Sequence, residues 1–473
     1  MTLSAADIIV VAAYVALALY LGIFAARRKA SKGVGAKEDY ILAGRRLTLP
    51  FFVATLVATW YGNILGVGEF IFGSGLVAWI SFGIPYYISA LLFAYFFAGK
   101  IRNTGAATIP EQIASAHGRR AGFISSVVVL LITIPAAYML MLGVMIQLFT
   151  GWSLAVSVTI GAAISLAYLY KGGFKSDVAT NAAQFILMYL GFGALATFAI
   201  MHYGSPGEMI SRLPAAHLSA TGGLSLQYVL AWYVIAFQTF VDPSFFQRCA
   251  AATSGKTARR GVFISVGFWL LFDMLTLACG LYARAYLPGA DPLLAFPALA
   301  ESVMPPYFKG LLLTAIIAII MSALSGYAFL TASTIGADIL LPLSHRIAFL
   351  KRYDARQLSR FGLFVSAVLG VLLALILPSA VDLIYKTSSI AVPALLSPLM
   401  LSYSKKFVMA RNRVIATIFL SAGASFFWTI LKITMTNNSF VQNIEPMLPG
   451  IIVATISTLA FTKRRENENL DNS

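Results

Sequence analysis

Long apolar stretches separated by short polar loops run through this sequence from end to end. A stretch of about 20 apolar residues is long enough to cross the hydrocarbon core of a bilayer as a helix. Segment after segment has this length with few or no charges, and 59% of all residues are hydrophobic while 11% are charged. Soluble enzymes do not show this pattern, so the sequence predicts an all-α integral membrane protein.

Thirteen segments match a membrane-spanning helix. No loop between them exceeds about 25 residues, which is too short for a folded domain of ordinary size. We therefore expect the function to lie within the membrane. The predicted spans are 7–26, 48–75, 76–99, 121–149, 153–170, 178–202, 225–252, 261–286, 307–341, 360–377, 381–403, 413–434 and 447–462.

The basic residues gather in alternate loops. Of 34 Lys and Arg residues, 28 fall within 27–47, 100–120, 171–177, 253–260, 342–360, 404–413 and 463–473. A formal charge of +16 suggests nucleic-acid binding in a soluble protein, but this alternation is the positive-inside bias of cytoplasmic loops. We therefore expect no nucleic-acid partner. The pattern predicts a multi-pass protein of the plasma membrane, in a bacterium the inner membrane, with its N-terminus outside and its C-terminus in the cytoplasm.

Residues 51–75 form an apolar run with polar and flexible residues near its middle, including Gly62, Asn63, Gly66 and Glu69. Hydrocarbon offers no partner to free backbone groups, so such a segment is stable only where protein or a hydrated cavity covers it. We interpret it as a broken helix that lines a site. The alternative is a glycine-rich packing face, which leaves the ionisable Glu69 without a role.

The predicted span 225–252 contains Gln238, Asp242 and Pro243 at its centre. Proline removes a backbone donor and clashes with the preceding turn, so we expect the helix to open near Val241 to Pro243. A proline-kinked packing helix is the alternative, and it does not explain an acid beside the kink.

If each broken span begins a set of five helices, the sets are 48–202 and 225–403, with opposite orientations in the membrane. Many secondary transporters have this inverted repeat, with a site near the bilayer midplane. The predicted organisation also has a leading helix and loop (1–47), an outer loop (203–224), two C-terminal helices (404–462) and a cytoplasmic tail (463–473).

Four stretches resemble the solute:sodium symporter family, whose fold is of the LeuT type with an extra leading helix. They are DYILAGRR at 39–46, the pattern from Ala58 to Gly75, GGFKSDVATNAAQ at 172–184, and the combination of Gln247–Arg248 with the run at 309–339. The resemblance covers nearly the whole length. It implies 13 helices arranged as a 5+5 inverted repeat with one extra N-terminal and two extra C-terminal helices.

The resemblance implies a sodium site formed by the carbonyls of Ala58, Tyr61 and Ile319 and the hydroxyl of Ser322. Two positions depart from the family pattern. Ala323 stands where the family has a second hydroxyl, and Asn181 replaces an aspartate often linked to sodium. Hard cations favour oxygen ligands, so these losses predict weaker sodium binding.

A proton is the alternative coupling ion, because a carboxyl group at membrane depth is able to titrate. Candidates are Glu69, Asp242, Asp273 and Asp338. For Asp273, a hydrogen-bonded structural acid is as good an interpretation as a proton relay.

For the solute, the resemblance places a gating side chain at Gln238, with Asp242 nearby and Asn63 and Glu69 opposite. Tyr233 is a further candidate for stacking on the solute. Two acids at a cavity favour a cationic or hydrogen-bonding solute, or hold the coupling proton instead. The sequence thus predicts a cation-coupled importer of a small polar solute that works by alternating access as a monomer. The alternative is a proton-coupled symporter or a uniporter of the same fold.

Other classes of function fit less well. The four histidines lie in loops or at span ends, and neither HExxH nor GxSxG occurs, so we do not expect an enzyme. No stretch resembles the selectivity loop of a channel. A transporter-like membrane sensor is the remaining alternative of another class, for which no output domain is recognisable.

Overall fold

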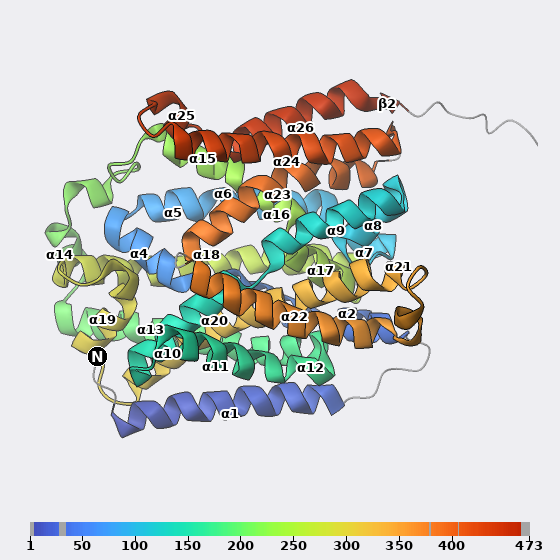
Figure 1. Ribbon diagram of the computed structural model, residues 1–473. Helices are drawn as coiled ribbons and strands as arrows, with labels where there is room; N and C mark the ends of the chain where they lie inside the picture. Colours follow the sequence, from blue (N-terminus) through green and yellow to red (C-terminus); the bar gives the residue numbers. More distant parts are fainter. Residues whose placement is uncertain (1–3, 28–34, 378–379, 405, 465–473) are drawn as a thin grey trace, which may run out of the picture.

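The computed structural model describes residues 4–27, 35–377, 380–404 and 406–464. Within them the chain forms a bundle of long helices that run roughly side by side (Figure 1). The basic residues expected at 28–34 and the polar tail at 465–473 lie outside the described residues.

Ten helical runs in the described part of the chain are long and apolar enough to cross a membrane, or eleven when one bent pair counts as a span. They are α1 (Ala5–Arg27), the bent pair α3 (Leu49–Trp60) and α4 (Ile64–Ser74), α5 to α7 (Val77–Thr104), α9 and α10 (Arg119–Thr150), α11 and α12 (Leu154–Gly172), α13 (Phe174–Tyr203), α15 to α17 (Leu226–Ala251), α18 (Gly255–Tyr286), α20 and α21 (Phe308–Leu343), α22 (Ala355–Ile376) and α24 (Arg411–Thr434).

Two further predicted spans correspond to α23 (Ala380–Ser402) and to α26 (Met447–Phe461), which has 15 residues. The prediction of a helical, multi-pass membrane protein is confirmed, whereas the number of thirteen spans stays a prediction. Shorter helices occupy the connections: α2 (Ala36–Leu42), α8 (Ile109–His117), α14 (Pro206–Arg212), α19 (Ala295–Val303) and α25 (Ser439–Asn443).

A small sheet departs from the all-α expectation. Strand β1 (Phe407–Met409) pairs antiparallel with β2 (Thr462–Arg464). β1 leads into α24 and β2 follows α26, and these two helices pack together. Because the helix ends meet at one end of the bundle, the two extended flanking segments come close enough to pair (Figure 1).

Helix α20 occupies the centre of the bundle (Figure 1). All its residues from Leu312 to Ser333 are buried. A helix that is apolar all round has to be covered on every side, and α1, α3, α10 and α13 pack around this one. Any polar side chain on α20 therefore faces other protein groups rather than lipid.

The first predicted broken helix is confirmed, because α3 and α4 meet at an angle of 58°. Tyr61 to Asn63 form the turn between them. A Cβ at Gly62 would lie 2.1 Å from the Cβ of Ala323 on α20 and 2.6 Å from the ring of Tyr138. Glycine thus allows the break to pack directly against the central helix.

The second predicted break, at Val241 to Pro243, is also confirmed. Asp242 has an extended backbone (φ −71°, ψ 118°) between α16 (Gln238–Val241) and α17 (Pro243–Ala251). Its Oδ1 accepts hydrogen bonds from the backbone N–H groups of Ser244 (2.7 Å) and Phe245 (3.3 Å), which have no partner within the helix. A hydrogen-bonded turn at Ala236–Phe237, which the sequence did not predict, separates α15 (Leu226–Ile235) from α16 without opening the helix.

Candidate functional site

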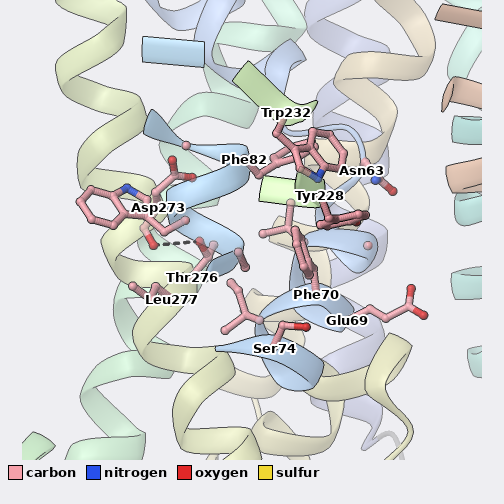
Figure 2. A pocket seen from close by; sticks show the side chains of 16 residues that line it. Asn63, Glu69, Phe70, Ser74, Phe82, Tyr228, Trp232, Asp273, Thr276 and Leu277 are labelled. Atoms are coloured by element: carbon pink, nitrogen blue, oxygen red, sulfur yellow. Dashed lines mark hydrogen bonds between the residues drawn. The ribbon is translucent and has the colours of Figure 1, made fainter. Parts of the chain in front are cut away.

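Two adjoining cavities lie beside the interrupted spans. The first lobe, about 410 Å³, is lined by residues of α4, α5 (Val77–Phe82), α15 and α18 (Figure 2). The second lobe, about 310 Å³, lies among the ends of α3, α6 (Ile84–Phe93), α15 and α16. Both lobes share a wall of five residues: Asn63, Val67, Phe82, Tyr228 and Trp232. They therefore form one continuous site at the two breaks.

Aromatic rings make up much of the wall. Phe82 and Trp232 meet edge to face with ring centroids 5.1 Å apart, and both lie in the aromatic group on one side of the first lobe (Figure 2). In the second lobe Trp60 and Tyr86 make a similar contact, also at 5.1 Å. Such a wall offers apolar area and negatively polarised ring faces to a solute.

Asp242 lines the second lobe with Gln238. Its Oδ2 accepts a hydrogen bond of 2.8 Å from the hydroxyl of Tyr327 on α20, while its Oδ1 caps α17. One carboxylate thus connects the cavity, the second break and the central helix.

Asp273 lines the first lobe from α18. It accepts hydrogen bonds from the hydroxyl of Tyr61, at 2.7 Å, and from that of Tyr87. Of the two interpretations from the sequence, the hydrogen-bonded acid is the one that the contacts support.

The structure brings four of the five predicted solute residues to the cavity. Asn63 lines both lobes, Glu69 the first, and Gln238 and Asp242 the second. The carboxylate of Glu69 points away from the aromatic group (Figure 2).

Tyr233 is the exception, because it is half-buried on α15 outside the lining of either lobe. Its neighbour Trp232 lines both lobes. Successive side chains on a helix point about 100° apart, so the two aromatic residues face different surroundings.

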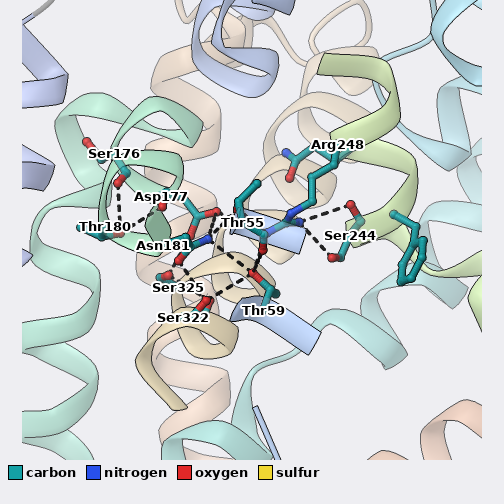
Figure 3. A network of polar contacts seen from close by, with 12 residues as sticks. Thr55, Thr59, Ser176, Asp177, Thr180, Asn181, Ser244, Arg248, Ser322 and Ser325 are labelled. Carbon is teal, nitrogen blue, oxygen red and sulfur yellow. Dashed lines mark hydrogen bonds and ion pairs between the residues drawn. The ribbon is translucent and has the colours of Figure 1, made fainter. Parts of the chain in front are cut away.

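A buried polar network lies where α3, α13, α17 and α20 meet (Figure 3). At its centre is Arg248, whose side chain is fully buried. Its guanidinium donates to the hydroxyls of Thr59 (2.7 Å) and Thr55 (3.1 Å), and it lies 3.6 Å from the carboxylate of Asp177. Asp177 in turn accepts a 2.7 Å hydrogen bond from Ser325.

The predicted sodium residues come together at the edge of this network. The hydroxyl of Ser322 lies 3.3 Å from that of Thr59, so α20 touches the end of α3 there. Ala58 and Tyr61 flank this contact on the α3 side, and Ile319 lies one turn before Ser322 on α20. The four residues are therefore neighbours in space.

The two departures from the family pattern have structural consequences. Asn181 accepts a hydrogen bond of 3.0 Å from Ser322 through its Oδ1 and donates one of 2.8 Å to Thr55 through its Nδ2. Because Ser322 donates its hydrogen to Asn181, the lone pairs of its hydroxyl oxygen stay available to a cation. Ala323 packs its methyl group against Gly62 at the first break.

Three residues of these sites were missed from the sequence. Asp177 precedes Asn181 by four residues, a spacing that places both on one face of α13 and offered a signal. Arg248 was noted only as part of a family motif. Glu445 lines the second lobe from the connection between α25 and α26, and an acid between apolar segments was its only signal.

The family model described as "Sodium:solute symporter family" matches residues 40–411. The chain belongs to the sodium:solute symporter family. A sodium/proline symporter of Haemophilus influenzae is 27% identical over 64% of this chain and 65% of its own length. A high-affinity choline transporter of Caenorhabditis elegans is 26% identical over 59% of this chain and 50% of its own length.

The chain thus aligns with between half and two thirds of the length of these two relatives. Among solved structures, a Na⁺-coupled sialic acid symporter in a substrate-bound outward-open state aligns over 98% of this chain and 99% of its own, with a TM-score of 0.78 and 15% identity. This likeness establishes the fold, which is that of the family and has the LeuT-type arrangement expected from the sequence.

Proposed function

We propose that the chain is a sodium-coupled secondary active transporter that imports a small polar solute by alternating access. One observation carries the proposal: the two interrupted spans contribute Asn63 and Asp242 to the same cavity. In many secondary transporters the unwound first helices of two inverted repeats form the solute site in this way. Membership of the sodium:solute symporter family supports sodium as the coupling ion.

For the ion, we propose the carbonyls of Ala58, Tyr61 and Ile319 together with the hydroxyl of Ser322. Their proximity supports this assignment, since oxygen ligands suit a hard cation. The methyl group of Ala323 and the neutral amide of Asn181, which stand where the family has a hydroxyl and a carboxylate, favour a low apparent affinity for sodium. A proton held at Asp242 or Glu69 is the second candidate, because both carboxyl groups line the cavity.

We further propose thirteen spans, with five-helix repeats at 48–202 and 225–403, the N-terminus outside and the C-terminus in the cytoplasm of a bacterial cell. The alternating basic loops support this orientation. We propose that a monomer is the functional unit. Reporter fusions after Lys463 and within the loop at 203–224 test the topology, and finding both reporters on the same side of the membrane would refute it.

An uptake screen in proteoliposomes tests the function. Radiolabelled amino acids, sugars and amines are offered under an inward sodium gradient. We expect saturable accumulation of one solute class, lost in Asp242→Asn at equal protein content. Failure of every class to accumulate, with intact protein in the vesicles, would argue against a transporter.

A further inference from the structure

Glu445 reaches the cavity from outside the region that the family model matches, residues 40–411. It lies in the connection between α25 and α26, within the C-terminal region (404–462) that follows the second proposed repeat. The backbone on its N-terminal side is fixed by two hydrogen bonds. Gln227 of α15 donates to the carbonyl of Asn443 at 2.6 Å, and the indole of Trp428 donates to that of Ile444 at 3.2 Å. The segment is therefore held against the first helix of the second repeat.

One oxygen of the Glu445 carboxylate lacks a hydrogen-bond donor in the described part of the chain. Its Oε2 is buried and has no hydrogen-bond partner among the described residues. The same holds for the Oδ1 of Asn63, which lines both lobes. Leaving a buried acceptor unpaired is unfavourable, and more so for a charged group. Two such acceptors at one cavity point to an occupant that supplies hydrogen-bond donors or positive charge.

The charge of the whole lining agrees with this conclusion. Glu69 and Asp273 line the first lobe, and Asp242 and Glu445 line the second. No Lys, Arg or His occurs among the described residues that line either lobe. An anionic solute would meet repulsion here, whereas a cation gains attraction from several sides.

The aromatic wall supplies the remaining element. Trp60 and Trp232 both line the second lobe, and Tyr86 links the ring of Trp60 to that of Phe82 at centroid distances of 5.1 and 5.4 Å. Aromatic faces around a desolvated pocket attract organic cations, and quaternary ammonium groups are recognised in this manner. A small inorganic cation, by contrast, prefers a cage of oxygen atoms.

We propose that this cavity takes an organic cation, a quaternary or protonated amine with an apolar body, and that Glu445 is a specificity-determining residue for it. The inference rests on the proposed function, because it names the solute class of the same transport site. The amine lies against Trp60 and Trp232, and its positive charge pairs with the carboxylates of Glu445 and Asp242. Through Glu445, the C-terminal region (404–462) takes part in selecting the solute.

A matched pair of probes separates charge from shape. Choline and 3,3-dimethylbutan-1-ol have nearly the same size and shape, but only choline carries a positive charge. The purified full-length chain in detergent is titrated with each, and binding is followed by tryptophan fluorescence, since two tryptophans line the second lobe. We expect choline to bind at least about tenfold more tightly, the effect of a well-placed cation–π contact.

The variant Glu445→Gln keeps the size of the side chain and removes its charge. We expect it to weaken choline binding roughly tenfold and to leave binding of the neutral alcohol unchanged, as a lost ion pair would. Glu208→Gln, in an exposed acid of α14, is the matched control and should change neither. Equal binding of both probes, or choline binding unaffected by Glu445→Gln, would overturn the proposal.

Uptake separates this inference from the proposed function. Accumulation of L-proline or glucose under a sodium gradient, with no binding of choline, would refute the cationic solute and leave the transporter intact. Choline binding that depends on Glu445, without uptake of any solute, would support the site and count against transport.

Discussion

Arg248 and Asp177 lie 3.6 Å apart in the centre of the bundle, and neither side chain is exposed beyond 1%. Two helices that are distant in the sequence, α17 and α13, are joined by this pair. Each charge was removed from water when the helices packed, so each depends on the other for compensation. Thr55 and Thr59 accept hydrogen bonds from one terminal guanidinium nitrogen on the α3 side, and Ser244 accepts from the other.

Removing one member of this pair should destabilise the protein strongly. We expect Arg248→Gln or Asp177→Asn alone to cost about 3–5 kcal/mol, because each leaves an unpaired buried charge. The double variant should cost clearly less than the sum of the two. Equilibrium unfolding in detergent–SDS mixtures measures this, with Lys37→Gln in the half-exposed pair Lys37–Glu111 as the control, expected at about 0–1 kcal/mol. Additive single effects would show that the two charges do not interact.

Ala323→Ser should strengthen the use of sodium. The substitution adds a hydroxyl to the side chain of Ala323, whose methyl group packs against Gly62 at the first break. The new oxygen would therefore lie close to Tyr61, one of the proposed sodium ligands. One more oxygen ligand should lower the sodium concentration needed for half-maximal uptake. Sodium-dependent protection of the purified protein against heat gives a second measure that does not require transport. Unchanged sodium dependence in both assays would contradict the weakened site.

Asp242→Asn should impair uptake without unfolding the protein. Asparagine caps a helix as well as aspartate does, so the capping bonds to Ser244 and Phe245 are retained while the charge is lost. We expect uptake to fall at least about tenfold, the effect of losing a charged contact with the solute or its ion. Gln238→Ala should also reduce uptake, whereas Tyr233→Phe, in a residue outside the cavity lining, should not. Normal uptake kinetics in Asp242→Asn and Gln238→Ala would assign this stretch to packing.

Choline binding should depend on pH through Glu445, because burial raises the pKa of this carboxyl group to about 7. Below pH 7 the group gains a proton and loses its negative charge, so binding should weaken as the pH falls from 8 to 6. Tyr228 of α15 faces Glu445, and the other titratable groups of the second lobe are Asp242, Tyr61, Tyr86, Tyr138 and Tyr327. Fluorescence titrations at both pH values should show the change in the native chain and a flat response in Glu445→Gln. The same slope in that variant would assign the titration to another group.

Both helix breaks were predictable because their causes are local. Glycine and asparagine in an apolar run, and proline after an aspartate, mark the position where a helix opens whatever packs around it. The cavity residues Asn63, Gln238 and Asp242 followed, since they lie at or next to these breaks.

The pair of Arg248 and Asp177 was not predictable in this way. The two residues lie 71 positions apart, and only the packing of α13, α17 and α20 brings them together. Glu445 depends likewise on how the connection between α25 and α26 folds over α15. Tyr233 shows the converse error. It is the neighbour of Trp232 in the sequence, but its side chain points in another direction on the helix and does not line the cavity.

Uptake of radiolabelled choline into proteoliposomes under an imposed sodium gradient, a proton gradient or neither tests the central claim, sodium-coupled transport, most directly. If choline fails to bind, the solute found in the uptake screen takes its place. We predict accumulation above equilibrium with the sodium gradient, at a low apparent affinity for the ion, and no accumulation without a gradient. Accumulation driven by the proton gradient alone, unchanged by the removal of sodium, would contradict the account.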